Sequence, residues 1–237
     1  MTSFVRRDLR VAVVPWILAR VVVVASLALS RHLFDEIGAA PRPVALGQGL
    51  FAWDAAYYRA IAEDGYRAVG HGSLRFFPLV PMLARVGGWI SFDHTAAALI
   101  VIANVSALLF GGLLHRLALR ETGDAALARR AAWFGALFPA AFVLVLGYAE
   151  ATAMMLGVLV FLGIRSNRFL WAAAAGFLAG LCRPVGVLLV IPIAVEGVRG
   201  WREASGRARA ARVTAVVAPV AGALAYLAWV GAEFGDF

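Results

Sequence analysis

Cysteine is nearly missing from this sequence, and lysine is wholly missing. Cys182 is the only cysteine, which excludes an intramolecular disulfide and argues against a cysteine-based metal site. All 22 basic residues are therefore arginine. They stand in short clusters between apolar runs rather than along one face, so membrane topology explains them better than a nucleic-acid partner does.

Charged residues are also scarce. Only 15% of the 237 residues are charged, whereas 62% are hydrophobic, and the mean hydropathy is +0.83. This composition lies outside the usual range of soluble globular domains. The sequence therefore predicts an integral membrane protein. It contains no low-complexity segment, no convincing repeat and no glycine-rich nucleotide loop.

The apolar runs predict an all-α polytopic membrane protein with about seven crossings, forming one transmembrane domain over residues 1–237. The first run follows a basic start, as a signal peptide does, but its length and the absence of a clear cleavage site favour an uncleaved span. The runs lie at about 11–30, 95–115, 132–149, 151–164, 169–182, 185–198 and 213–232, with a shorter proline-containing run at 76–90.

Arginine placement orients these runs, because short cytoplasmic loops are enriched in basic residues. The rule places the N-terminus in the cytoplasm. The clusters agree only if 31–94 forms one long extracytoplasmic loop, in which 76–90 does not cross fully but lies at, or dips into, the outer interface. We expect a multi-pass protein of a bacterial plasma membrane. The clusters are Arg6, Arg7 and Arg10; Arg116, Arg120, Arg129 and Arg130; Arg165 and Arg168; and Arg199, Arg202, Arg207, Arg209 and Arg212.

The three runs between 151 and 198 are short. Each has about 14 residues, or about 21 Å of helix, against a hydrocarbon core of about 30 Å. Merging 169–198 into one kinked span is the simpler reading, but the charge bias favours two short helices broken at "LCRPVG". Short helices would wall a funnel that opens outward. This topology gathers the polar candidates on the extracytoplasmic side: Asp54, His71, Arg75, Glu150 and Arg183.

The stretch 50–65 has the pattern of an amphipathic helix at the membrane surface, with Gly65 as its C-cap. Asp54 then has two readings. It is an N-cap that accepts backbone N–H bonds, or the helix starts at Gln48 or Gly49 and Asp54 is a general base one turn inside it. The apolar stripe comprises Trp53, Tyr57, Ala60 and Ile61, and the flank comprises Asp54, Tyr58 and Arg59.

The other polar candidates also have competing readings. Glu150 is a solvated loop charge or part of a site. Arg183 contacts lipid headgroups or, as we favour, clamps a substrate phosphate. His71 and Arg75, taken singly, are headgroup contacts. Arg20, near the middle of the first span, is either the partner of a phosphate or carboxylate or a member of an internal structural pair.

Two consecutive segments, "WDAAYYRAIAEDGY" and "RFFPLVPML", resemble the PIG-V type of mannosyltransferase, a branch of the polytopic GT-C glycosyltransferases. Two later segments are similar as well: "GYAEATAMMLGVLVFLG" resembles the Tyr-x-Glu helix start of that family, and "AAGFLAGLCRPVGVLLVIP" resembles its Arg-Pro/Ser-x-Gly turn. The first block is the more specific one. Its matching residues are Trp53, Asp54, Tyr58, Ile61, Ala62, Gly65, Tyr66, Phe76, Phe77, Pro78 and Pro81.

The resemblance implies a GT-C-like helix bundle, with interfacial helices in the first extracytoplasmic loop, that transfers mannose from polyprenyl-phosphate mannose to a hydroxyl of a lipid or glycan acceptor. Asp54 would be the catalytic carboxylate, Trp53 and Tyr58 would support its loop, and Arg183 would contact the carrier phosphate. His71, Arg75 and Glu150 complete the expected substrate-binding set. We expect no cofactor beyond the lipid-linked donor and no metal ligands, with metal dependence left open.

The chain departs from the family pattern in two ways, in its residues and in its number of spans. Ala149 and Thr152 replace serines of a Tyr-Ser-Glu-Ser element, which affects acceptor contacts more than the base. Family members continue with further spans, so the resemblance leaves three readings: a short member, a fragment, or one part of a split enzyme for which a second membrane chain supplies the further helices. The alternatives to mannosyl transfer are a GT-C-type transferase of another lipid-linked sugar, and a non-catalytic membrane subunit or transporter. Membrane lipids are expected partners, and nucleic acid is not.

Overall fold

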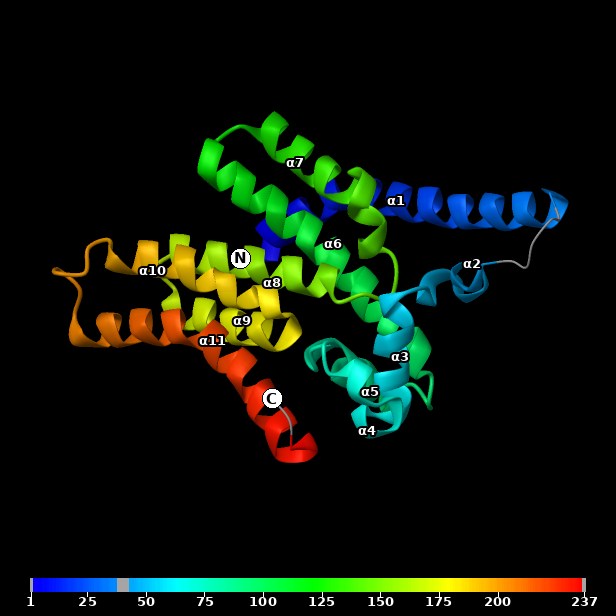
Figure 1. The fold of residues 1–237 in the computed structure, drawn as a ribbon. Coiled ribbons are helices and arrows are strands. Elements are labelled where there is room, and N and C mark those ends of the chain that lie inside the picture. Colours follow the sequence, from blue (N-terminus) through cyan, green and yellow to red (C-terminus); the bar gives the residue numbers. More distant parts are fainter. Residues whose placement is uncertain (1, 38–42, 236–237) are drawn as a thin grey trace. The chain divides into compact units, whose positions relative to one another are not determined.

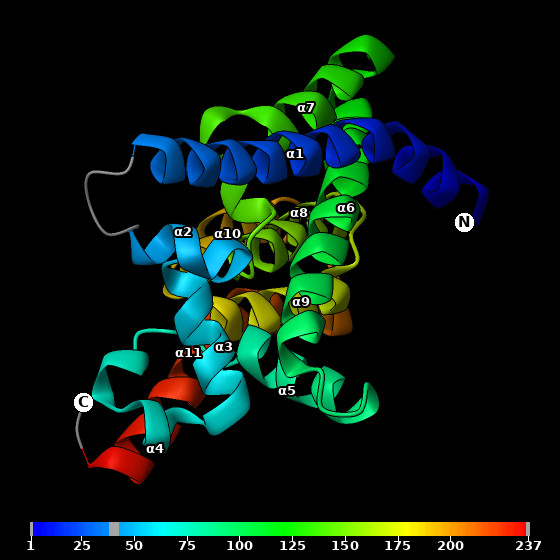
Figure 2. The ribbon, with the colours of Figure 1, turned by 90° about the vertical axis from the view of Figure 1, so that its right-hand side faces the viewer.

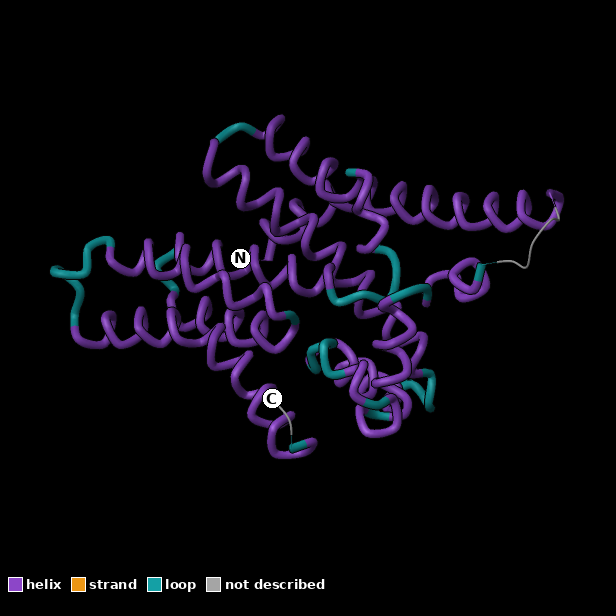
Figure 3. Tube along the Cα trace, in the orientation of Figure 1, coloured by secondary structure: helices purple, strands orange, loops and turns teal. Residues whose placement is uncertain are grey.

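The computed structural model describes residues 2–37 and 43–235, and within these ranges every regular element is a helix (Figure 3). In this described part of the chain, three helices are long and apolar enough to cross a membrane: α1 (Thr2–Ile37), α6 (Thr95–Thr122) and α11 (Gly206–Phe234). The prediction of an all-α membrane protein is confirmed at this level.

The chain forms two compact units. The first comprises residues 1–73 and 80–151, and the second comprises 74–79 and 152–237. The expectation of a single transmembrane domain stays a prediction.

In the first unit, α1 crosses α6, and α7 (Ala125–Leu137) packs against both (Figure 2). Small residues allow the close approach at the crossing. A Cβ added at Gly112 would lie 2.9 Å from the Leu9 side chain. The remaining elements of this unit are short: α2 (Val44–Gln48), η1 (Gly49–Phe51), α3 (Asp54–Asp64), α4 (Tyr66–Val69), η2 (His71–Ser73), α5 (Leu79–Ile90, with Leu79 in the second unit) and η3 (Pro139–Leu144).

The apolar run 132–149 does not form the single helix that one crossing would require. Helix α7 ends at Leu137, Phe138 is extended, and Pro139 opens the 3₁₀ helix η3. Proline lacks the N–H that a continuing helix needs and disfavours the α conformation in the residue before it. A turn over 145–149 then leads to α8 (Glu150–Arg165).

The short helix α5 lies within the 76–90 run. Its 12 residues make about 18 Å of helix, well short of the hydrocarbon thickness. This length agrees with the expectation of a segment that does not cross.

The second unit is built around α9 (Phe169–Cys182) and α11, which lie side by side (Figure 1). A Cβ added at Gly180 would clash with the Pro219 carbonyl oxygen, and one at Gly222 would clash with the Phe177 carbonyl oxygen. The predicted break in 169–198 is confirmed: α9 ends before Arg183, and η4 (Pro184–Leu189) and α10 (Val190–Val198) follow.

Candidate functional site

Asp54 is the first residue of helix α3. Trp53 is the N-cap, with a φ of 53° that is uncommon for a bulky side chain. Both positions expected for Asp54 are therefore wrong, because it is neither the N-cap nor one turn inside a helix that starts at Gln48 or Gly49. Those two residues belong to the separate short elements α2 and η1. The role of Asp54 as a general base stays a prediction. The carboxylate sits in the first helical turn, where the exposed N–H groups favour negative charge.

The buried face of α3 differs from the predicted stripe. Tyr58, expected on the flank, is buried, whereas Trp53 and Tyr57 are exposed. The helix packs against α6, and its aromatic residues divide between the core and the surface. The buried residues are Ala55, Tyr58, Ile61 and Ala62.

The far end of α3 is closed by a glycine and an arginine. Gly65, with a φ of 88°, donates its backbone N–H to the Ile61 carbonyl at 3.0 Å, which confirms it as the C-cap. Arg85 of α5 donates to the carbonyls of Ala62 at 2.9 Å and Ile61 at 3.2 Å. These bonds satisfy acceptors that a helix end leaves open.

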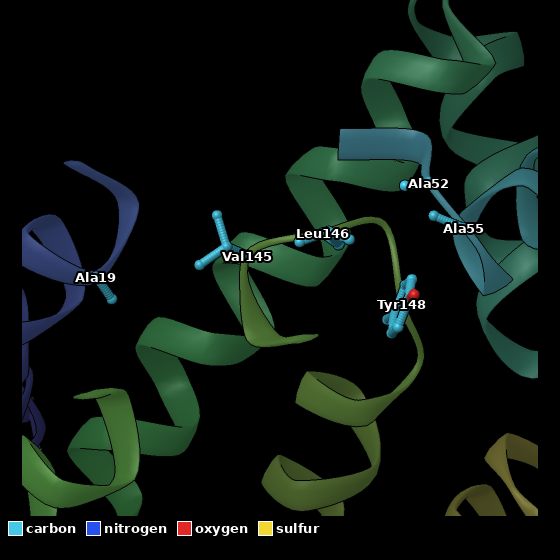
Figure 4. Packing of buried hydrophobic residues seen from close by; sticks show 6 residues of the cluster. All are labelled: Ala19, Ala52, Ala55, Val145, Leu146 and Tyr148. Atoms are coloured by element: carbon cyan, nitrogen blue, oxygen red, sulfur yellow. The ribbon is translucent and has the colours of Figure 1, made fainter. Parts of the chain in front are cut away.

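The turn over 145–149 packs against the start of α3. The Gly147 N–H donates to the Leu50 carbonyl at 3.1 Å and so joins the turn to η1. Figure 4 shows Leu146 and Tyr148 on the turn beside Ala52 and Ala55, and Ala19 of α1 on the side of Val145. Tyr148 is 6% exposed. The turn thus buries a tyrosine beside the start of α3.

Tyr148 marks the point where two acidic residues meet. Burial raises the pKa of Tyr148 to about 12, a hydrogen bond with the Asp54 backbone opposes the rise, and the nearby charges of Asp54 and Glu150 add to it. The phenol is therefore close enough to sense both carboxylates. Sequence reasoning missed Tyr148 as a site residue, although the Tyr-x-Glu pattern contained the signal.

Glu150 is the first residue of α8 and is half-buried. The interpretation of Glu150 as a solvated loop charge is therefore wrong. Like Asp54, it places its carboxylate in the first turn of a helix, where negative charge is stabilised. The structure thus brings together two predicted site residues, Asp54 and Glu150, around a third that was not predicted.

An apolar groove of about 460 Å³ adjoins this site within the first unit. It runs along the second half of α1 and past η3, and the Trp53 side chain forms part of its wall. The Trp53 and Phe142 rings lie 6.3 Å apart at its edge. Its wall includes Val22, Val23, Leu27, Trp53, Phe142 and Leu146.

The other predicted site residues lie elsewhere in the chain. His71 opens η2 in the first unit and is exposed. Arg75 belongs to the second unit, where its guanidinium lies 5.0 Å from the centre of the Phe76 ring. Arg183, also in the second unit, is an extended residue between α9 and η4. A meeting of Arg183 with Asp54 stays a prediction.

Among the described residues, no group of three or more His, Cys, Asp and Glu side chains could hold a metal ion. Comparisons with protein-family models, with curated proteins and with solved structures found no match to this chain.

Proposed function

We propose that this membrane protein transfers mannose from polyprenyl-phosphate mannose to an acceptor hydroxyl, on the extracytoplasmic face of a GT-C-like helix bundle. One observation carries the proposal. The carboxylates of Asp54 and Glu150 both act on the buried phenol of Tyr148. Two acids at two helix starts around one tyrosine form a site suited to proton transfer.

Asp54 is the proposed general base. Its carboxylate accepts the proton of the acceptor hydroxyl while the acceptor oxygen forms a bond to the anomeric carbon of the sugar. The bond from that carbon to the phosphate oxygen breaks, and polyprenyl phosphate leaves with the electron pair. Attack from the face opposite the phosphate inverts the anomeric centre.

Tyr148 cannot share the role of base. A phenol with a pKa of about 12 stays protonated at neutral pH, so it acts as a hydrogen-bond donor or acceptor. In this proposal, Tyr148 lies between the two carboxylates and orients the reacting groups. Glu150 is the proposed contact to the acceptor, and Trp53 and Tyr58 support the α3 segment.

The leaving phosphate needs positive charge. Arg183 is the proposed clamp, helped by Arg75 or His71, because arginine binds phosphate through paired hydrogen bonds. The apolar groove beside Trp53 supports a lipid-linked donor, since its wall is suited to a hydrocarbon chain and it adjoins the proposed base.

The proposal is tested by reconstituting the protein in liposomes with radiolabelled polyprenyl-phosphate mannose and a lipid extract as the acceptor. Asp54→Asn should lower transfer about 10²–10⁴-fold, the usual contribution of a proton-transfer partner. Asp64→Asn is the matched control, because Asp64 is exposed at the other end of the same helix and should leave the rate unchanged.

Two results would count against this assignment. Substantial transfer by the Asp54→Asn protein would remove Asp54 from the role of base. Transfer from polyprenyl-phosphate arabinose or glucose at a higher rate than from the mannose donor would replace mannose with that sugar and leave the reaction class intact.

A further inference from the structure

Arg20 lies within the first candidate span and places its guanidinium among three internal acceptors. Its Nε donates to Asn104 Oδ1 at 2.8 Å, its Nη1 to the Trp16 carbonyl at 3.0 Å, and its Nη2 to the Leu144 carbonyl at 3.0 Å. The guanidinium carbon also lies 4.4 Å from the centre of the Trp16 ring. Arg20 is therefore a member of an internal network.

Asn104 of α6 completes this network. Its Nδ2 donates to the Ile100 carbonyl at 2.8 Å and to the Val145 carbonyl at 3.1 Å, and its own carbonyl accepts from Trp16 Nε1 at 2.9 Å. Arg20 and Asn104 thus bind two consecutive carbonyls, those of Leu144 and Val145. We call these two side chains the polar clamp.

The clamp acts where the backbone leaves regular structure. Leu144 ends η3, and the residues after it form a turn. Both Leu144 and Val145 are 2% exposed. Their carbonyls lie within hydrogen-bonding distance of a residue inside a membrane span, where water is scarce and unsatisfied backbone groups are costly. A guanidinium and an amide supply the donors that a continuing helix would have supplied.

The clamped residues connect directly to the candidate site. Two positions further along, Gly147 donates to the Leu50 carbonyl, and a Cβ at Gly147 would lie 3.1 Å from the Leu99 side chain. Tyr148 follows, with its N–H bonded to the Leu146 carbonyl at 2.7 Å. The four residues 145–148 thus connect the polar clamp to Tyr148 through closely packed backbone.

We propose that Arg20 and Asn104 are positioning residues, which hold the 144–149 turn so that Tyr148 and Glu150 face Asp54. The catalytic part of this inference rests on the proposed transfer reaction. The structural part stands on the hydrogen bonds alone, so the two parts can fail separately.

The structural part is tested by hydrogen–deuterium exchange of the full chain in lipid nanodiscs. Arg20→Met removes both the charge and the donors, and it should speed exchange of the Gly147 and Tyr148 amides at least about tenfold while exchange in α9 and α11 stays unchanged. Arg20→Lys keeps the charge but lacks the planar fork, so it should give an intermediate rate. Asn104→Leu is the second variant, and Arg10→Met, at an exposed position of the same helix, is the matched control.

The catalytic part is read from steady-state transfer by the folded fraction of each variant. Arg20→Met should lower kcat about tenfold or more, with little change in KM for the donor, whereas a merely structural arginine would lower the folded fraction and leave kcat unchanged.

Two results would overturn the inference. Unchanged exchange over 144–149 in both Arg20→Met and Asn104→Leu would remove the clamp. Faster exchange with an unchanged kcat would remove its positioning role. If the wild type transfers no sugar at all, the exchange data still test the clamp, and only the proposed function fails.

Discussion

The two compact units of this protein differ in where arginines bind their backbone and in how closely their helices approach. In the first unit, arginines reach from helices to carbonyls of irregular segments: Arg20 to Leu144, Arg31 to Leu46 at 2.7 Å, and Arg85 to Ala62. In the second unit, the helices α9 and α11 approach so closely that Gly180 and Gly222 face backbone atoms of the opposite helix.

In the second unit, Arg209 and Arg212 of α11 also bind backbone carbonyls, and they do so around the segment between α10 and α11. Arg165 and Arg199 flank Glu196 at 3.5 and 2.9 Å, and Arg212 donates to the carbonyls of Gly197 and Arg199 before α11 becomes apolar. In the first unit, therefore, polar bonds secure short, irregular segments around a candidate site. The second unit has the close glycine contacts of a scaffold.

The largest expected effect on stability comes from a substitution at Gly180, where α9 and α11 make close contact. Gly180→Val should destabilise the second unit by about 3 kcal/mol, because the new Cβ meets the Pro219 carbonyl and neither helix can yield without backbone movement. Thermal unfolding in detergent measures the change. Gly157→Ala is the control, since nothing lies within 4 Å of a Cβ there, and it should be neutral or slightly stabilising. Equal losses in the two variants would contradict the scaffold assignment.

The pH dependence of stability comes next. The pKa of Tyr148 is raised from 10.0 to about 12 in the folded protein, so the neutral phenol stabilises the fold fully below pH 10. This contribution is lost as the pH rises from about 10 to 12. The melting temperature of the wild type should therefore fall relative to that of Tyr148→Phe across this window. Parallel curves would show that Tyr148 is not buried beside the carboxylates.

The effects of two glutamate substitutions on kcat/KM, one in each unit, should differ. Glu150→Gln in the first unit should lower kcat/KM about tenfold, or about 1.4 kcal/mol, through lost acceptor contacts. Glu196→Gln in the second unit breaks an ion pair with arginines and should leave kcat/KM within about threefold of the wild type. The transfer assay measures both, and a larger loss for Glu196→Gln would reverse the division of roles.

The smallest effect concerns the exposed side of α3. Arg59 and Glu63 form an i, i+4 pair at 2.9 Å with both side chains partly in solvent. Arg59→Met should change stability by no more than about 0.5 kcal/mol, as exposed pairs do. A loss of several kcal/mol by thermal unfolding would show that the surface of α3, as well as its packing, determines the stability of the first unit.

Local chemistry predicted several features of the fold. Hydropathy gave the membrane class, Gly65 marked the end of α3, and "LCRPVG" marked the break before η4, because each depends on neighbouring residues alone. The turn over 145–149 was not predicted, because Pro139 lies within the apolar run 132–149, whose hydropathy indicates one continuous span. The prediction for the buried face of α3 was wrong, because it placed Tyr58 on the flank, whereas Tyr58 is buried.

Long-range contacts account for the rest. The partners of Arg20 lie 84 and 124 positions further along the chain, at Asn104 and Leu144, so no local pattern could choose between a substrate partner and an internal network. Tyr148 was missed for the same reason, because its role depends on Asp54, which lies in a distant helix.

The most direct test of the central claim, that Asp54 and Glu150 work together around Tyr148, is a double-mutant cycle in kcat. Residues that act as one unit give losses that do not multiply. The Asp54→Asn and Glu150→Gln double variant should be no more than about threefold slower than Asp54→Asn alone. If the double variant instead shows the full product of the two single losses, the two carboxylates act independently, and the site described around Tyr148 is not the site of transfer.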